Sequence, residues 1–237
     1  MDNTIDNTFA FFRPDLRILM KLKDAETLRL LYRSTRQFTD INQLAEGYIF
    51  RNYNYFFQGN PNLEAAFFDV VNLNYQSINI FNFTNIFANL SYSVRDNAIQ
   101  NTTSVAGINS VRSASNSNFP REIYTASGRI DKRSKNFKGG ASINYNYSDF
   151  NNIINNTPTA SSNFTQRYRL NIATNFRIKP NIEVGYTYSI RDYKTGNVES
   201  KFFTDAPYVR LDAYFLKGFV FNAKYTYNFY RNEEQTL

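Results

Sequence analysis

The stretch from Asn181 to Ile190, Asn-Ile-Glu-Val-Gly-Tyr-Thr-Tyr-Ser-Ile, alternates between two kinds of side chain. Every second residue is apolar or aromatic: Ile182, Val184, Tyr186, Tyr188 and Ile190. The residues between them are small or polar. Because successive side chains of a strand point to opposite faces, this stretch predicts a strand with one apolar and one wet face. The same alternation covers nearly the whole chain and predicts an all-β fold, an antiparallel up-and-down transmembrane β-barrel.

The charged residues of these alternating segments fall among the polar positions. On a lipid-facing surface an arginine at mid-bilayer costs about 2–4 kcal/mol, whereas beside a water-filled lumen it costs little. The charges are therefore sorted as a membrane barrel requires. The pattern predicts about ten strands, near residues 11–22, 27–35, 67–78, 84–96, 121–133, 137–149, 166–177, 181–193, 207–216 and 219–230. The charged residues on the predicted polar face are Arg29, Arg33, Arg167, Arg169, Arg210, Asp212 and Lys224.

The predicted connections alternate in length. Short turns are expected at Lys23–Glu26, Asn79–Phe83, Arg133–Asn136, Ile178–Asn181 and Leu216–Gly218. Long polar loops are expected at residues 36–66, 97–120, 150–165 and 194–206. Such alternation is typical of a barrel with tight periplasmic turns and extended external loops.

A soluble β-sandwich or surface adhesin would also show alternating strands and Gly, Asn and Pro turns. In such proteins the apolar face packs inward and is dominated by Val, Leu and Ile. Here Tyr and Phe gather near strand ends, as at Tyr145 and Tyr147, which resembles the aromatic girdle of a membrane barrel. The aromatic positions therefore favour the membrane barrel.

The composition narrows the function. The chain of 237 residues has 23 Phe, 18 Tyr, no Cys and no His. Without histidine, no Ser-His-Asp, Cys-His or zinc-His site can be assembled from these residues. Carboxylate chemistry remains possible, but no local pattern suggests it, so we expect no enzyme activity, no metal and no cofactor. The net charge of +7 comes from dispersed residues, and its densest patch, Lys132 to Lys138, falls at a predicted turn. We therefore expect no nucleic-acid partner.

Residues 27–78 carry a resemblance to a known family. The order is a strand at residues 28–36, a short element at 41–44, a turn, and a new strand near residue 70. It resembles the carboxy-terminal barrel of TonB-dependent receptors, in the branch labelled outer-membrane β-barrel family. The turn matches at Gly59, Asn60, Pro61 and Leu63, and Arg36 and Leu44 match the element before it. Gln37 and Phe38 stand where that family commonly has a proline, and Glu64-Ala65-Ala66 replaces its usual x-Pro-Glu.

The resemblance implies a larger protein with a barrel of about 22 strands closed around an amino-terminal plug. On that basis we expect residues 1–237 to be a partial outer-membrane barrel that lacks the plug domain, the signal peptide and the final strands. The implied location is the outer membrane of a Gram-negative bacterium. The implied partners are outer-membrane lipid and, through the plug, the TonB system.

The family implies uptake of a large, scarce solute such as a siderophore-like metal chelate or an oligosaccharide. Loop 36–66 is the predicted ligand site because aromatic side chains stack on flat or ring-shaped ligands; the alternative is that these aromatics form the outer girdle or pack the loop. The loop aromatics are Tyr48, Phe50, Tyr53, Tyr55, Phe56 and Phe57. Basic residues expected to face the lumen, where they attract anions or pair with carboxylates, are Arg29, Arg33, Arg167, Arg169 and Arg210. The alternative function is a self-contained small pore or adhesin without energised transport.

Overall fold

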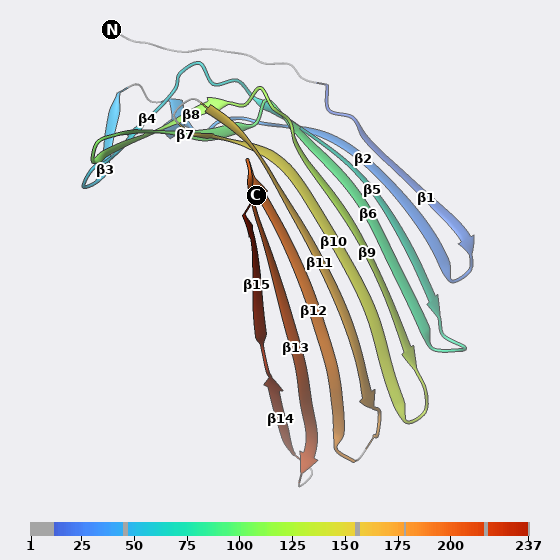
Figure 1. Ribbon diagram of the computed structural model, residues 1–237. Coiled ribbons are helices and arrows are strands. Elements are labelled where there is room, and N and C mark those ends of the chain that lie inside the picture. Colours follow the sequence, from blue (N-terminus) through green and yellow to red (C-terminus); the bar gives the residue numbers. More distant parts are fainter. Residues whose placement is uncertain (1–11, 45–46, 155–156, 178, 216–217, 237) are drawn as a thin grey trace.

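Long antiparallel strands form a curved wall in the computed structural model of this protein (Figure 1). The structure describes residues 12–44, 47–154, 157–177, 179–215 and 218–236. Along the wall the strands follow the order β1-β2-β5-β6-β9-β10-β11-β12-β13-β14. Their bounds are β1 Asp15–Lys23, β2 Glu26–Gln37, β5 Ala66–Asn79, β6 Thr84–Asp96, β9 Arg121–Arg133, β10 Phe137–Ile154, β11 Thr157–Thr174, β12 Asn181–Thr195, β13 Val198–Phe215 and β14 Phe219–Thr226.

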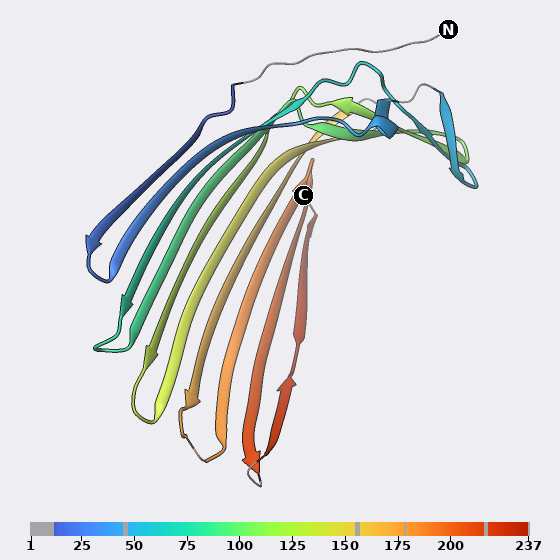
Figure 2. The ribbon, with the colours of Figure 1, turned by 180° about the vertical axis from the view of Figure 1, so that it is seen from behind.

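The ten predicted strands are confirmed: nine of the alternating segments each overlap one strand of the wall, and the last, 219–230, begins with β14 and runs into β15. Short turns join β1 to β2, β5 to β6 and β9 to β10 at one end of the wall, as predicted, and both views show these turns together along that end (Figures 1 and 2). Three residues at the start of predicted elements lie outside the described residues: Phe11 begins the predicted strand 11–22, and Ile178 and Leu216 begin two predicted turns. In the described part of the chain, no helix is long and apolar enough to cross a membrane.

The loops predicted at residues 150–165 and 194–206 are wrong. Strands β10 and β11 stay paired up to Ile154 and Thr157, and strands β12 and β13 up to Thr195 and Val198. These hairpins continue past the length that a membrane requires, since a spanning strand needs about 9–11 residues. Their polar ends satisfy their backbone groups by pairing with each other, which polarity alone does not reveal.

The two remaining long connections are also not plain loops. Residues 38–65 contain a short helix and two strands, and residues 97–120 contain two more strands. We call the four strands the loop sheet. Its members are β3 Tyr48–Asn52, β4 Tyr55–Gln58, β8 Asn109–Asn116 and β7 Ile99–Ala106, in that order, and the helix α1 is Ile41–Leu44. The central contact is a parallel pairing of β4 with β8, between segments far apart in the chain, so local patterns could not predict it.

The loop sheet lies at the end of the wall opposite the short turns (Figures 1 and 2). It touches the wall through β7, where Thr103 pairs with Ile154 of β10. The external side predicted for the long connections therefore carries a folded platform.

The last predicted strand, 219–230, is split in the structure by one proline. Strand β13 pairs with β14 up to Thr226 and then with β15, Phe229–Thr236, in the same register. Between them the amide of Tyr227 donates to the carbonyl of Pro207 over 3.0 Å. Proline has no N–H to return that bond, so the ladder is interrupted there without any shift of register.

The register of the wall sorts the side chains into two faces. One continuous row of neighbours runs across eight strands and is mostly polar: Arg29, Asn74, Asn89, Ser127, Asn144, Arg167, Ser189 and Thr204. The next row, on the opposite face, is Leu30, Leu73, Leu90, Ala126, Tyr145, Gln166, Ile190 and Phe203. We call these faces the polar face and the apolar face. The charged residues predicted for the polar face all lie on it.

An aromatic belt crosses the apolar face. Neighbouring rings from β6, β9, β10, β11, β12 and β13 contact one another, with centroids 4.8 to 6.5 Å apart. The belt consists of Tyr92, Tyr124, Tyr145, Tyr147, Phe164, Tyr168, Tyr188 and Phe203. Amphipathic rings of this kind sit at the level of lipid headgroups.

Charged side chains of the apolar face lie at its two ends: Glu26 and Lys132 lie near the turns, and others lie at the belt and beyond it, toward the loop sheet. The hydroxyls of Tyr92 and Tyr124 both donate to Glu122, over 3.1 and 2.9 Å. Farther out, Lys194 pairs with Glu199, whose carboxylate raises the pKa of Lys194 by accepting its hydrogen bond and attracting its charge. Between the belt and the turns the apolar face exposes large side chains such as Leu90, Leu170 and Ile182, which a lipid environment would cover.

The two faces should respond differently to the same substitution. Leu90→Arg, on the apolar face, should destabilise the membrane-inserted protein by about 2–4 kcal/mol because it brings a charge into hydrocarbon. Ser91→Arg, the next residue but on the polar face, should cost far less. The measurement is the free energy of unfolding in urea from lipid vesicles. Equal losses for both variants would contradict the assignment of the faces.

Candidate functional site

The polar face carries many more cations than carboxylates. Among the side chains described on strands β1 to β14, its carboxylates are Asp15, Asp131, Glu183 and Asp212. Each of them already has a partner in the wall. Asp15 binds Arg17 and Arg33, Asp131 binds Arg129, Asp212 binds Arg210, and Glu183 accepts from Tyr208. The remaining arginines and lysines of this face therefore leave it with uncompensated positive charge.

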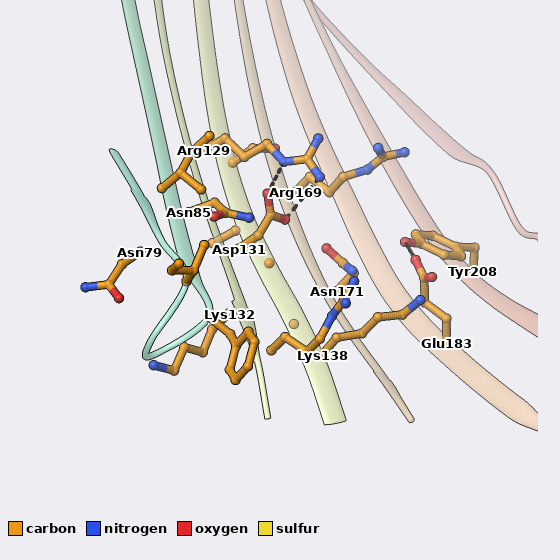
Figure 3. Close-up of a pocket in the computed structure, with 18 residues that line it drawn as sticks. Asn79, Asn85, Arg129, Asp131, Lys132, Lys138, Arg169, Asn171, Glu183 and Tyr208 are labelled. Carbon is orange, nitrogen blue, oxygen red and sulfur yellow. Dashed lines mark hydrogen bonds and ion pairs between the residues drawn. The ribbon is translucent and has the colours of Figure 1, made fainter. Parts of the chain in front are cut away.

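A recess of about 610 Å³ opens on the polar face at the end near the turns (Figure 3). In it Arg129 donates two hydrogen bonds to Asp131, over 2.6 and 3.0 Å. Gly140 leaves room for this pair, because a Cβ there would come within 2.6 Å of the Asp131 carboxylate. We call this hollow the turn-side recess; it also contains Lys138 and Asn171.

Tyr208 lies flat across the neighbouring strand at the edge of the turn-side recess. It pairs with Gly185, and a Cβ on that glycine would lie 2.4 Å from the tyrosine ring. The Tyr208 hydroxyl donates to Glu183 over 2.6 Å, and only 9% of the residue is exposed. A glycine inside a strand often marks such a close approach, and here it lets the aromatic ring cover the backbone.

A second recess, of about 380 Å³, adjoins the first along the polar face. Its floor consists of small residues on β12 and β13, Thr187, Ser189, Thr204 and Ala206. Cationic side chains stand on either side, from β11 and from β14, and none of the described residues that line it is a carboxylate. We call it the hydroxyl recess.

The five arginines predicted to face the lumen differ in their ion pairs and in their places in the wall. Arg33 and Arg210 are held by ion pairs of 3.0 Å to Asp15 and Asp212. Arg29 lies on β2, as Arg33 does, and is separated from Arg167 and Arg169 by β5, β6, β9 and β10. Arg167 and Arg169 lie together on β11 and line the hydroxyl recess. The predicted set is therefore not a single site, and only its β11 members share a recess.

The six aromatics predicted as a ligand site divide between the faces of the loop sheet. Phe50 and Phe56 pair across β3 and β4 with ring centroids 5.8 Å apart. Phe57 is buried, and Arg51 covers its ring at 5.6 Å. Tyr55 is half-buried, and its hydroxyl accepts from Arg112. Phe57 therefore packs the loop sheet, whereas Tyr48, Phe50 and Tyr53 remain largely exposed to solvent.

The Gly59-Asn60-Pro61-x-Leu63 turn joins the two long connections. The Asn60 amide donates to the carbonyl of Gln43 in α1, and its side chain donates to the carbonyl of Ala114 in β8. Leu63 closes the turn by donating to the carbonyl of Asn60 over 3.4 Å. The turn motif is therefore a structural link between the two connections.

A polar clamp follows directly after this turn. Asn116 accepts from the Glu64 amide over 2.8 Å and donates to the carbonyls of Glu64 and Asn97. The Asn97 side chain in turn donates to the Glu64 carboxylate over 3.1 Å. Together these bonds fasten residues 38–65 to residues 97–120.

Sequence patterns missed Tyr208 and Lys224 as parts of a site. Tyr208 stands in a polar-face position, where an aromatic residue breaks the expected alternation, and Gly185 opposite it interrupts a strand. Together these two irregularities could have indicated a special contact. Lys224 was predicted on the polar face, but its proximity to Arg169 depends on the pairing of four strands, β11 to β14.

The bilayer-length strands, the two sorted faces and the aromatic belt define the wall of an outer-membrane β-barrel, whose polar face lines the lumen. The model of the outer membrane protein beta-barrel family matches residues 1–233. The chain therefore belongs to this family, and the outer membrane is its location. Searches of curated proteins and of solved structures found no significant match.

The contact between Gly185 and Tyr208 predicts an unusual sensitivity to one methyl group. Gly185→Ala should displace the ring, weaken its bond to Glu183 and cost about 1–3 kcal/mol of unfolding free energy. The matched control is Gly128→Ala, whose new Cβ would meet Ile143 at an ordinary 3.4 Å. In a Tyr208→Ala background the cost of Gly185→Ala should fall to near zero. A persistent full cost in that background would show that the ring is not the cause.

The polar clamp should protect the external connections. Asn116→Ala removes two hydrogen bonds between them and one within residues 97–120, so cleavage of the loops by an added protease in intact cells should accelerate about tenfold. The exposed Asn118 provides the control, since Asn118→Ala removes no such bond. The wall itself should keep its melting temperature in both variants. Unchanged cleavage in Asn116→Ala would contradict the role of the clamp.

Proposed function

We propose that this chain is the barrel wall of a TonB-dependent receptor, which takes up a large, scarce solute across the outer membrane of a Gram-negative bacterium. The solute is a siderophore-like metal chelate or an oligosaccharide. The TonB system would supply the energy through a plug domain in the lumen. The proposed role is binding and transport, without catalysis.

The observation that carries this proposal is the width of the wall. Its edge strands β1 and β14 lie at opposite sides in both views, and they do not pair with each other (Figures 1 and 2). A self-contained barrel of these ten strands would bring the two edges together, and side chains would occupy much of its narrow interior. Here the polar face instead holds recesses of about 610 and 380 Å³. This geometry supports a wide lumen that admits a large solute or a plug.

The loop sheet supports a role in solute capture. It exposes Tyr48, Phe50 and Tyr53 beyond the end of the wall, on a platform that the polar clamp fastens in place. Exposed aromatic rings on a fixed scaffold favour stacking on sugar rings or on planar chelates, because little conformational entropy is lost on binding.

The alternative, a small pore or an adhesin without energised transport, is favoured by one feature only. Exposed aromatics on an external platform would also serve adhesion to a surface. The separation of the edge strands counts against the small pore.

The test is cross-linking of the full-length protein to TonB in living cells, with and without a protonophore. A receptor of this class should cross-link to TonB and should lose energised uptake when the proton-motive force collapses. Steady single-channel conductance of the purified protein without any TonB cross-link would overturn the proposal and would establish the pore. A protein with neither property that still binds surfaces would establish the adhesin.

A further inference from the structure

The hydroxyl recess is lined by hydroxyl groups and by cationic side chains. Thr187, Ser189 and Thr204 place hydroxyl-bearing side chains along its floor, with Ala206 leaving space beside them. Arg167 and Arg169 stand on one side and Lys224 on the other, all of them exposed to the lumen. Five neighbouring strands, from β10 to β14, contribute to this arrangement.

The three cations of the recess have no carboxylate partner among the described residues. The nearest acidic groups of the polar face are already engaged, since Glu183 accepts from Tyr208 and Asp212 is paired with Arg210. This contrasts with Arg129 in the turn-side recess, whose charge is balanced by Asp131. Three like charges around one hollow repel each other, and a bound anion would relieve that repulsion.

Tyr208 holds two of these cations in position. The Lys224 ammonium lies 4.9 Å from the centroid of its ring, and the Arg169 guanidinium lies 6.0 Å from it. The ring is itself fixed by its fit over Gly185 and by its bond to Glu183. The charged groups are therefore oriented before any ligand arrives, which lowers the entropic cost of binding.

Guanidinium, ammonium and hydroxyl donors together recognise oxyanions. Arginine can present two parallel N–H groups to a carboxylate or a phosphate, and hydroxyls complete the coordination of the remaining oxygens. A neutral saccharide would leave the three cations without a counter-charge, because no carboxylate of the described residues lines the recess. The donor set thus selects for negative charge.

We propose that the hydroxyl recess is a binding site for a solute that carries at least two oxyanion groups, phosphate or carboxylate. This inference rests on the proposed function and specifies the solute that the lumen conducts. Arg167, Arg169 and Lys224 bind the anionic groups, Thr187, Ser189 and Thr204 donate to their oxygens, and Tyr208 is a positioning residue.

The experiment is calorimetric titration of the full-length protein, purified from outer membranes in detergent, with three probes. Sodium pyrophosphate and trisodium citrate should both bind, and maltotetraose should not. If pyrophosphate alone binds, the site takes phosphate groups, and if citrate alone binds, it takes carboxylates. Arg167→Gln and Lys224→Gln should each weaken binding about tenfold, since each removes a charge-assisted contact. Raising the salt concentration should weaken binding further.

The matched control is Arg29→Gln. Arg29 is an exposed arginine in the same row of the polar face as Arg167, and four strands lie between its strand, β2, and β11. Its variant should bind both anions as the parent does, and heat-modifiable migration on a gel should show that every variant is folded. If Arg29→Gln weakened anion binding as much as Arg167→Gln does, the binding would depend on the overall positive potential of the lumen. That result would overturn the proposed site. Absence of anion binding by the parent protein would also overturn it.

Equilibrium binding in detergent needs neither TonB nor a membrane potential. Anion binding without any TonB cross-link in cells would therefore leave the site standing and refute energised transport. A TonB cross-link without anion binding would refute only the site.

Discussion

The rest of the structure depends on a backbone constraint. In the hydrocarbon of a bilayer there is no water to bond N–H and C=O groups, so each spanning strand must satisfy them with its neighbours. The wall does this in antiparallel ladders from β1 to β13, with one register shift near the turn between β1 and β2, and the ladder between β13 and the last strands is interrupted at Pro207, which lacks an N–H donor. Because the backbone N–H and C=O groups point to neighbouring strands within the sheet, each side chain must point to one of its two faces.

That two-sided geometry explains where charge resides. The apolar face presents leucine, isoleucine and valine bounded by an aromatic belt, so lipid can cover it at no electrostatic cost. The polar face holds the arginines, and its carboxylates are consumed in pairs within the wall. The resulting excess of positive charge is a property of the lumen, and it becomes a local site only where small floor residues make room, as between Arg169 and Lys224.

At the external end, the long connections are stabilised by pairing with each other, although they lie outside the membrane. Beyond the membrane, water could satisfy the backbone of long connections, yet here the two longest connections pair with each other into the loop sheet. Asn116 and Asn60 fasten them with side-chain hydrogen bonds to backbone groups. The family-like turn at Gly59 to Leu63 thereby acquires a physical role, which is to place the exposed aromatics on a fixed platform.

The period-two alternation by itself determined the strands, the turns, the order of the wall and the face on which each charge lies. It did so because a one-residue shift would move every side chain to the wrong face, so a single pattern dictates all of these features. Only the tertiary structure decided the rest: the pairing of β4 with β8, the extension of the β10–β11 and β12–β13 hairpins, and the gathering of Arg167, Arg169 and Lys224 beside Tyr208. The pairing of β4 with β8 and the gathering of the three cations join residues far apart in the chain, so local sequence does not encode them. The hairpin extensions join residues that are close in the chain, but their polar ends satisfy their backbone groups by pairing, which polarity alone does not reveal.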